Sequence, residues 1–183
     1  SLDGTKVKAN ASKHHALSWD YARKLEEQLK GEIEELLQKA NDTDQQDVPE
    51  GMNIPEELAR RETRLEAIAE AKAQIEQRAA ECFAEEQKEH EKKMAARKAK
   101  EKKTGKKPGG RSPRPPSPGP KSKDQVNLTD RDSRIMPSHG KGFEQSYNAQ
   151  AAVDTESMLI VEHHISQQSN DKKEITPSIE NLS

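Results

Sequence analysis

Three aspartates occupy positions from which a carboxylate can help to bind a divalent cation. Asp3 precedes Gly4, Asp154 follows an alternating run of apolar and polar residues, and Asp171 opens an Asp-x-x-Glu pattern. Carboxylate oxygens are the ligands that Mg²⁺ prefers in proteins. Each aspartate also has a plainer explanation, because Asp-Gly and Asp154-Thr-Glu-Ser are turn sequences and Asp-x-x-Glu has the spacing of a helix cap. Residue types alone therefore favour turn or cap roles for all three.

The other metal-ligating residues do not form a chelating pattern. Histidine occurs in two adjacent pairs and at two single positions: His14-His15, His163-His164, His90 and His139. Adjacent side chains point in different directions on a helix and to opposite faces of a strand, so neither pair predicts a preformed metal site. The single cysteine, Cys82, excludes both a disulfide framework within the chain and a zinc site built from cysteines.

Positive charge is concentrated in the middle of the chain. The 183 residues carry 31 Lys+Arg and 33 Asp+Glu, a net charge of −2, yet residues 85–123 contain 14 Lys/Arg against 5 Glu. Such a block indicates an arm that binds phosphates, and residues 92–123 have enough charge to bind duplex DNA without sequence preference. The alternative is a solvated linker, because no aromatic residue lies between the cations to stack on bases.

Two amphipathic helices must precede and carry this basic block. Apolar residues recur at spacings of three and four over residues 19–40 and again from residue 55 to about 98, with a solvated extension to about 103. A loop with turn chemistry separates them, which predicts an antiparallel hairpin with an internal core rather than a partner groove. The residues expected to face one another are Leu25, Leu29, Ile33 and Leu36 on the first helix and Leu58, Leu65, Ile68 and Ile75 on the second.

The remaining segments predict an irregular tract followed by a hairpin. Residues 104–123 hold six of the ten prolines, together with Gly, Ser and basic residues, which is typical of a disordered, partly polyproline-like linker. Residues 147–153 alternate in polarity, 154–157 form a turn sequence and 158–165 are more apolar, so we expect a β-hairpin. A helix should begin near residue 170 or 171.

Composition limits what such a chain can do. Only 30% of the residues are hydrophobic and 3% are aromatic, while 35% are charged. One core spanning the whole chain is excluded, since burial would not offset the entropy of ordering. No apolar run approaches the roughly 18 residues of a membrane helix, and the N-terminus has no signal-type region. We therefore expect a soluble, cytoplasmic protein without membrane contact, and an internal fragment of a longer one.

Three segments, in the same order, resemble bacterial insertion-sequence transposases of the DDE, RNase H-like class. The first is Leu2-Asp-Gly-Thr-Lys-Val-Lys-Ala-Asn-Ala-Ser12, and the second is Asn127-Leu-Thr-Asp-Arg-Asp-Ser-Arg-Ile-Met136. The third is Gly142-x4-Tyr147-Asn-Ala-Gln-Ala-Ala-Val-Asp154. Leu159-Ile160-Val161 and Asn170-Asp171 also fit the pattern. The resemblance covers both ends of the chain and not the helical, proline-rich middle, which is similar only as a charged insertion.

The resemblance implies an α+β fold. A partial RNase H-like sheet, made of the first strand and the following hairpin, would be interrupted by the helical hairpin and the disordered basic linker. The divisions are residues 1–18 for the first strand and loop, 19–103 for the insertion, 104–126 for the linker and 127–183 for the hairpin and the start of a helix. Residues 2–7 should pair with residues 147–153 despite about 140 intervening residues, since loop closure costs rise slowly with length.

The resemblance also assigns a catalytic role to Asp3. It matches the first catalytic aspartate, one of three carboxylates that hold Mg²⁺ or Mn²⁺ for phosphoryl transfer in this family. No Asp-x-Gly-Tyr segment occurs in the chain, so the second aspartate and the final glutamate are expected beyond residue 183. Lys8, Arg131, Arg134 and Lys141 are candidate contacts to DNA phosphates, with solvated loop charges as the alternative.

Two functions of different classes follow. The first is a fragment of a DNA transposase that is inactive alone. The longer protein would be associated with the nucleoid, would act on element ends and target DNA, and could form homo-oligomers. The second is a non-enzymatic coiled-coil and disordered-arm protein that binds nucleic acid or a protein. Asp3 in its Asp-Gly-Thr-Lys context favours the transposase, because a scaffold has no need of that segment.

Overall fold

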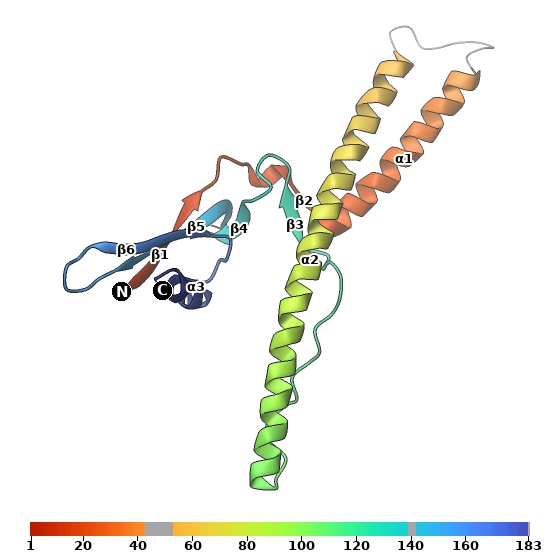
Figure 1. Ribbon diagram of the computed structural model, residues 1–183. Helices are drawn as coiled ribbons and strands as arrows, with labels where there is room; N and C mark the ends of the chain where they lie inside the picture. Colours follow the sequence, from red (N-terminus) through yellow and green to blue (C-terminus); the bar gives the residue numbers. More distant parts are fainter. Residues whose placement is uncertain (43–52, 139–141, 183) are drawn as a thin grey trace. The chain divides into compact units, whose positions relative to one another are not determined.

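The computed structural model describes residues 1–42, 53–138 and 142–182 (Figure 1). The chain divides into two compact units. The sheet unit comprises Ser1–Leu17 and Gln125–Ser183, and the helical unit comprises Ser18–Asp124. The fold is of the mixed α+β class, as predicted. Most of the loop expected at residues 41–54 lies outside the described residues.

The helical unit consists of α1 (Trp19–Asp42) and α2 (Ile54–Thr104), close to the predicted bounds. The start of α2 is fixed by Asn53, whose side chain accepts a hydrogen bond from the Glu56 amide at 3.4 Å, and by a proline in the first turn. Gly105 ends the helix with a left-handed φ of +65°, and its amide bonds to the Glu101 carbonyl.

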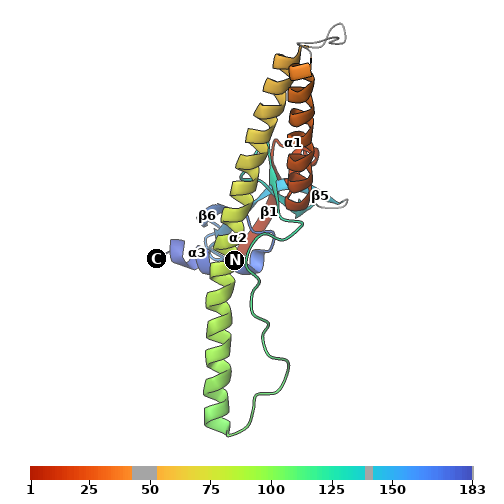
Figure 2. The same ribbon diagram turned by 90° about the vertical axis from the view of Figure 1, so that its right-hand side faces the viewer.

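The two helices pack in the predicted antiparallel hairpin (Figure 2). Glu26 bonds to Lys72 at 2.6 Å, and Glu32, further along α1, bonds to Arg61, which lies earlier in α2. The hydrogen bonds from Lys30 and Lys72 lower the pKa of Glu26 to about 2. The buried residues of the interface are Ala22, Leu29 and Leu36 from α1 and Ile68, Ala71 and Ile75 from α2. The remaining predicted interface residues, Leu25, Ile33, Leu58 and Leu65, are only half-buried.

Beyond Ile75, α2 has no buried residue among those described, as its fading apolar stripe predicts. The tract that follows contains neither helix nor strand from residue 105 to residue 124, which also agrees with the sequence. It is not a detached linker, however. The extended chain returns along the lower half of α2 in both views (Figures 1 and 2).

The sheet unit is built around one long strand, β5 (Phe143–Val153). β1 (Leu2–Lys8) pairs with it antiparallel, from Leu2 opposite Ala152 to Lys8 opposite Ser146. β6 (Ile160–Ser166) and the shorter β4 (Arg134–Pro137) also pair antiparallel with β5. Ser146 pairs with both Lys8 and Arg134, and Ala149 pairs with both Thr5 and Ile165. Therefore β4 and β6 share the edge of β5 that faces away from β1. The predicted pairing of residues 2–7 with residues 147–153 is confirmed.

Short elements complete this unit. The 3₁₀ turn η1 (Lys13–His15) leads into β2 (Ala16–Ser18), which pairs with β3 (Gln125–Asn127). After β6, the 3₁₀ turn η2 (Asp171–Lys173) starts where a helix was predicted, and α3 (Ile175–Asn181) follows it. No helix in the described part of the chain combines the length and apolar character that crossing a membrane requires.

Candidate functional site

Asp3 lies inside a strand and not in a turn. It occupies the second position of β1, opposite Ala151, which in turn lies opposite His163 on β6. The turn explanation of Asp-Gly is therefore wrong. Directly opposite residues share a face of a sheet, so Asp3 and His163 lie on one face, two strands apart. The Asp3 side chain is exposed, and its Oδ1 accepts a hydrogen bond of 2.9 Å from the Gly4 amide.

The face that carries Asp3 is largely apolar and open. Val7 is 49% exposed and Ile165 is 73% exposed, and Thr5 and Ala149 lie between them in the register. On β1, β5 and β6 the strand alternation places no other carboxylate on this face near Asp3. The candidate catalytic group therefore stands at the edge of an uncovered apolar surface.

The residues present do not fit a two-metal site. In the described ranges no group of three or more His, Cys, Asp or Glu residues is arranged so that it could hold a metal ion. Asp154 is a turn residue, as predicted, because its Oδ2 accepts hydrogen bonds from the amide and the hydroxyl of Ser157. Asp171 lies over the opposite face from Asp3. No step of a metal-dependent reaction can be derived from these residues alone.

Asp171 hydrogen-bonds to side chains on one face of the sheet and is not the predicted helix cap. The cap of η2 is Asn170, which accepts a hydrogen bond from the Lys172 amide at 3.0 Å. The Oδ1 of Asp171 accepts bonds from Asn148 at 2.7 Å, Gln150 at 2.8 Å and Lys6 at 3.1 Å. These hydrogen bonds lower the pKa of Asp171, and the bond from Asn148 has the largest effect. They attach the segment after β6 to the middle of β1 and β5.

Gly4 leaves room for these hydrogen bonds, and its replacement by alanine should lower the free energy of unfolding by about 1–2 kcal/mol. A Cβ at Gly4 would overlap Gln150 Nε2 and lie 2.8 Å from Asp171 Oδ1, so the bond between those side chains would be disturbed. Urea unfolding followed by circular dichroism measures the change.

Gly31→Ala is the matched control for Gly4→Ala. Nothing lies within 4 Å of a Cβ built at Gly31 in α1, and alanine favours a helix by up to about 1 kcal/mol over glycine. This variant should be more stable than the unmodified chain. Two variants that shift stability in the same direction would contradict the close approach at Gly4.

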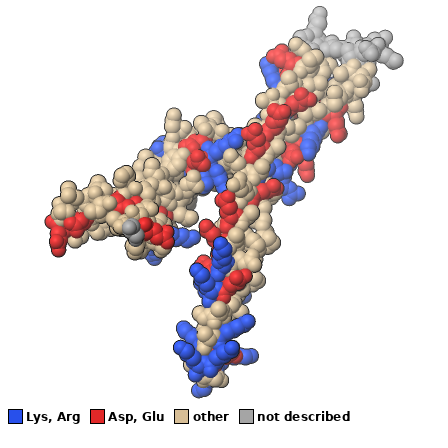
Figure 3. All heavy atoms as spheres, viewed as in Figure 1, with Lys and Arg blue, Asp and Glu red and all other residues tan. Residues whose placement is uncertain are grey.

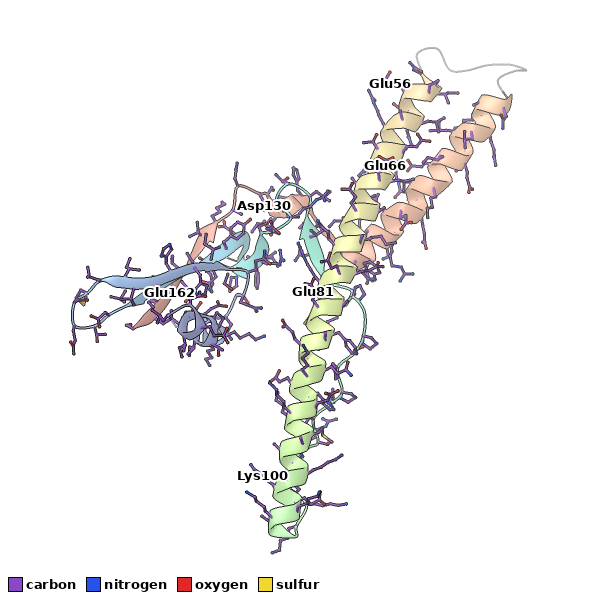
Figure 4. All side chains as sticks on the ribbon, in the orientation of Figure 1. Glu56, Glu66, Glu81, Lys100, Asp130 and Glu162 are labelled. Carbon is purple, nitrogen blue, oxygen red and sulfur yellow. The ribbon has the colours of Figure 1, made fainter. Side chains whose placement is uncertain are left out.

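A second polar cluster holds α3 against the same face. His164 lies between two buried carboxylates, with Nδ1 at 2.8 Å from Glu162 Oε1 and Nε2 at 2.9 Å from Glu174 Oε2. Ser166 also donates to Glu174, and Asn181 donates to Glu162. Figure 4 shows Glu162 on the strand beside α3. The side chains of Glu162 and Glu174 are only 5% and 3% exposed.

The charges in this cluster stabilise one another. The hydrogen bond with Glu174, reinforced by Glu162 and opposed by burial, raises the pKa of His164. The hydrogen bond from Asn181, together with that from His164, lowers the pKa of Glu162. The sequence correctly placed His163 and His164 on opposite faces. It missed the role of His164, because the Asp-x-x-Glu pattern suggested a cap and Glu174 instead reaches the sheet.

The motif at residues 127–136 forms a self-bonded loop. The Asn127 side chain accepts hydrogen bonds from the amides of Thr129 and Asp130. The Asp130 side chain accepts hydrogen bonds from the amides of Asp132 and Ser133. The Tyr147 hydroxyl lies 2.8 Å from both carboxylate oxygens of Asp130. Burial and this contact raise the pKa of Tyr147 to about 12.

Two of the four predicted DNA contacts, Lys8 and Arg134, do not lie on the face that carries Asp3. Lys8 and Arg134 both lie opposite Ser146, and strand alternation puts them on the other face from Asp3. The Arg134 guanidinium donates to the carbonyls of residues 131–133 and to Gln167 Oε1. Arg131 is exposed in the preceding loop. Lys141 lies outside the described residues.

Comparison with protein-family models, with curated proteins and with solved structures gives no significant match.

Proposed function

We propose that the chain is part of a DNA transposase of the DDE, RNase H-like class, in which Asp3 is the first catalytic carboxylate. The observation that carries this proposal is the pairing of β1, β5 and β6. An RNase H-like sheet begins with three consecutive antiparallel strands in this spatial order, and here β5 and β6 follow β1 only after an insertion of more than a hundred residues.

The surroundings of Asp3 support the same proposal. A carboxylate on an exposed strand position can reach a substrate, whereas a carboxylate in a structural role is normally bonded to distant groups. The apolar face next to it, with Val7 and Ile165 exposed, suits a sheet that is covered by further protein in the complete enzyme.

The cofactor and partners follow from the proposal. Mg²⁺ or Mn²⁺ would serve the complete enzyme, with Asp3 as one ligand, because an all-oxygen site suits these ions. The other carboxylates would come from outside the 183 residues. The partners would be the DNA of the element ends and of the target, and a second copy of the enzyme, in the nucleoid of a bacterial cytoplasm.

The competing function is a non-enzymatic nucleic-acid-binding protein, and the basic end of α2 favours it. Neighbouring sequence in the gene separates the two functions. An upstream helix-turn-helix region and a downstream Asp-x-Gly-Tyr and Glu segment, in frame or across a frameshift, support the transposase. A start codon immediately upstream and an unrelated gene downstream contradict it.

The direct test is a plasmid assay. The purified 183-residue chain is incubated with a supercoiled plasmid that carries the element's ends, with Mg²⁺ or Mn²⁺, beside the longer protein under the same conditions. We expect nicking and strand transfer from the longer protein and neither from the chain alone. Nicking by the chain alone that disappears in Asp3→Ala would contradict its catalytic incompleteness, and an inactive longer protein would contradict the transposase itself.

A further inference from the structure

The C-terminal half of α2 and the tract behind it carry most of the positive charge of the helical unit. Residues 92–114 contain eleven Lys/Arg and a single acidic residue, Glu101. The end of α2 that bears Lys100 is densely blue in Figure 3, and Figure 4 labels that residue. We call the exposed cations of this region, apart from Lys93, which pairs with Glu89, the basic strip: Lys92, Lys98, Lys100, Lys102 and Lys103 from α2, and Lys106, Lys107, Arg111 and Arg114 from the tract.

The tract lies antiparallel to α2 and is bonded to it at successive levels. The Thr104 hydroxyl contacts the carbonyls of Lys100 and Lys106 where the chain turns. Further back, His90 Nε2 lies 3.4 Å from the Pro113 carbonyl, and Lys121 lies 3.8 Å from Glu86. Two parts of the sequence are thereby brought side by side, and both carry cations.

Arg97 fastens the central part of the tract. Its Nη2 donates to the carbonyl of Pro108 at 3.1 Å and to that of Gly110 at 3.2 Å. Arg97 is half-buried, whereas its neighbour Lys98 is exposed. Gly110 has a left-handed φ of +85°, a conformation that glycine adopts without strain. Arg97 therefore positions the tract, and Lys98 on the same turn of helix does not.

Apart from Glu101, the acidic residues of this part of α2 precede the basic strip in the sequence. Glu86 pairs with Lys121, and Glu89 pairs with Lys93 at 2.6 Å. Both carboxylates precede residue 92, so they neutralise cations at the edge of the basic strip and not within it. A surface about 20 Å long, by the rise of an α-helix over residues 92–104, remains with a strong excess of positive charge.

We propose that the basic strip binds the phosphate backbone of duplex DNA and that Arg97 holds it in shape for that contact. Duplex DNA carries a charge every 1.7 Å or so along its axis, which matches a dense row of cations. No aromatic residue lies between residues 84 and 124 to stack on single-stranded bases. The apolar residues near the basic strip are only Met94 and alanines, which is too little for insertion into a membrane surface.

The fixed course of the tract matters because a flexible arm loses conformational freedom when it binds. A tract already fastened to α2 has lost that freedom in the free protein. Release of the tract should therefore weaken DNA binding even where its charges are kept. This inference does not depend on the catalytic role of Asp3.

Two variants that each remove one positive charge test the proposal in the full chain. Binding of a labelled random-sequence duplex of about 20 base pairs is followed by fluorescence anisotropy between about 50 and 200 mM salt. Lys98→Gln should reduce the slope of log K against log salt by about 1, as expected for one lost phosphate contact. Arg97→Gln should leave the slope nearly unchanged while weakening binding about tenfold, because it frees the tract.

Limited trypsin digestion reports the position of the tract independently. Cleavage after Lys106 and Arg111 should become faster in Arg97→Gln and stay unchanged in Lys98→Gln, with equal helix content by circular dichroism. The proposal is overturned if both variants lower affinity and slope equally, if the chain fails to bind duplex at about 50 mM salt, or if vesicles of anionic lipid compete better than duplex. A negative plasmid-nicking result leaves these outcomes unaffected, so the two proposals fail separately.

Discussion

Replacing Asp3 by alanine should abolish DNA strand cleavage by the longer protein that the proposed function requires, while its affinity for DNA changes little. We expect a loss of about a thousandfold or more, the scale on which groups that act on the reacting atoms affect turnover. The effect should not come from unfolding, because the Asp3 side chain is exposed and, within the described residues, its carboxylate bonds only to the adjacent Gly4 amide. Nicking of supercoiled plasmid measures the rate.

Glu156→Ala is the matched control for this prediction. Glu156 is an exposed carboxylate in the turn between β5 and β6 of the same unit, and its removal changes the net charge equally. Cleavage by Glu156→Ala should match that of the unmodified protein, and both variants should unfold at the same urea concentration. Activity in Asp3→Ala within a factor of a few of the control would remove Asp3 from the catalytic machinery.

The elements that depend on local pattern could be predicted from the sequence. The helices of the hairpin follow from apolar spacing, and the cap at Asn53 and the glycine at residue 105 account for the limits of α2. The pairing of Leu2–Lys8 with residues of β5 could be predicted only through the resemblance, since no local signal joins segments so far apart. Once the pairing is given, strand alternation fixes which residues share the face of Asp3.

The polar contacts between distant segments could not be predicted in this way. Asp171 and Glu174 have the spacing of a capping box, yet both side chains bond to the sheet, because buried donors on β1, β5 and β6 need acceptors. The tract after α2 has a composition typical of disorder, yet Arg97 and His90 bind its carbonyls. Composition indicates how much apolar surface a segment can bury. It does not indicate which of its backbone carbonyls the side chains of a neighbouring helix can reach.

His164→Ala should destabilise the sheet unit strongly, by about 3 kcal/mol or more, because it leaves two buried carboxylates without their shared cation. The carboxylates of Glu162 and Glu174 lie on either side of the His164 imidazole, and each contacts one of its ring nitrogens. The outer side chains of α3 contribute little to its attachment, since Ile175 and Ile179 are 53% and 59% exposed. Amide hydrogen exchange across α3 and urea unfolding should both report the loss.

The adjacent histidine supplies the control. His163 is exposed on the other face of β6, so His163→Ala should change the free energy of unfolding by less than about 0.5 kcal/mol. The two variants have the same composition and differ only in which face of the strand loses its imidazole. Equal destabilisation by both would show that the cluster beneath α3 does not hold the helix.

The same cluster predicts how stability depends on pH. The pKa of His164 is raised above its ordinary value of 6.5, so its stabilisation is fully present below pH 6.5 and is lost as the pH rises through the higher folded value. The pKa of Glu162 is lowered below 4.5, so its contribution is present above pH 4.5 and is lost as the pH falls through the lower folded value. The sheet unit should therefore be most stable between pH 4.5 and pH 6.5, where both contributions are fully present. Urea midpoints measured from pH 5 to pH 9 should fall as the pH rises above 6.5 in the unmodified chain and in His163→Ala. In His164→Ala this fall should be absent, and a fall of the same size in that variant would mean that another group is responsible.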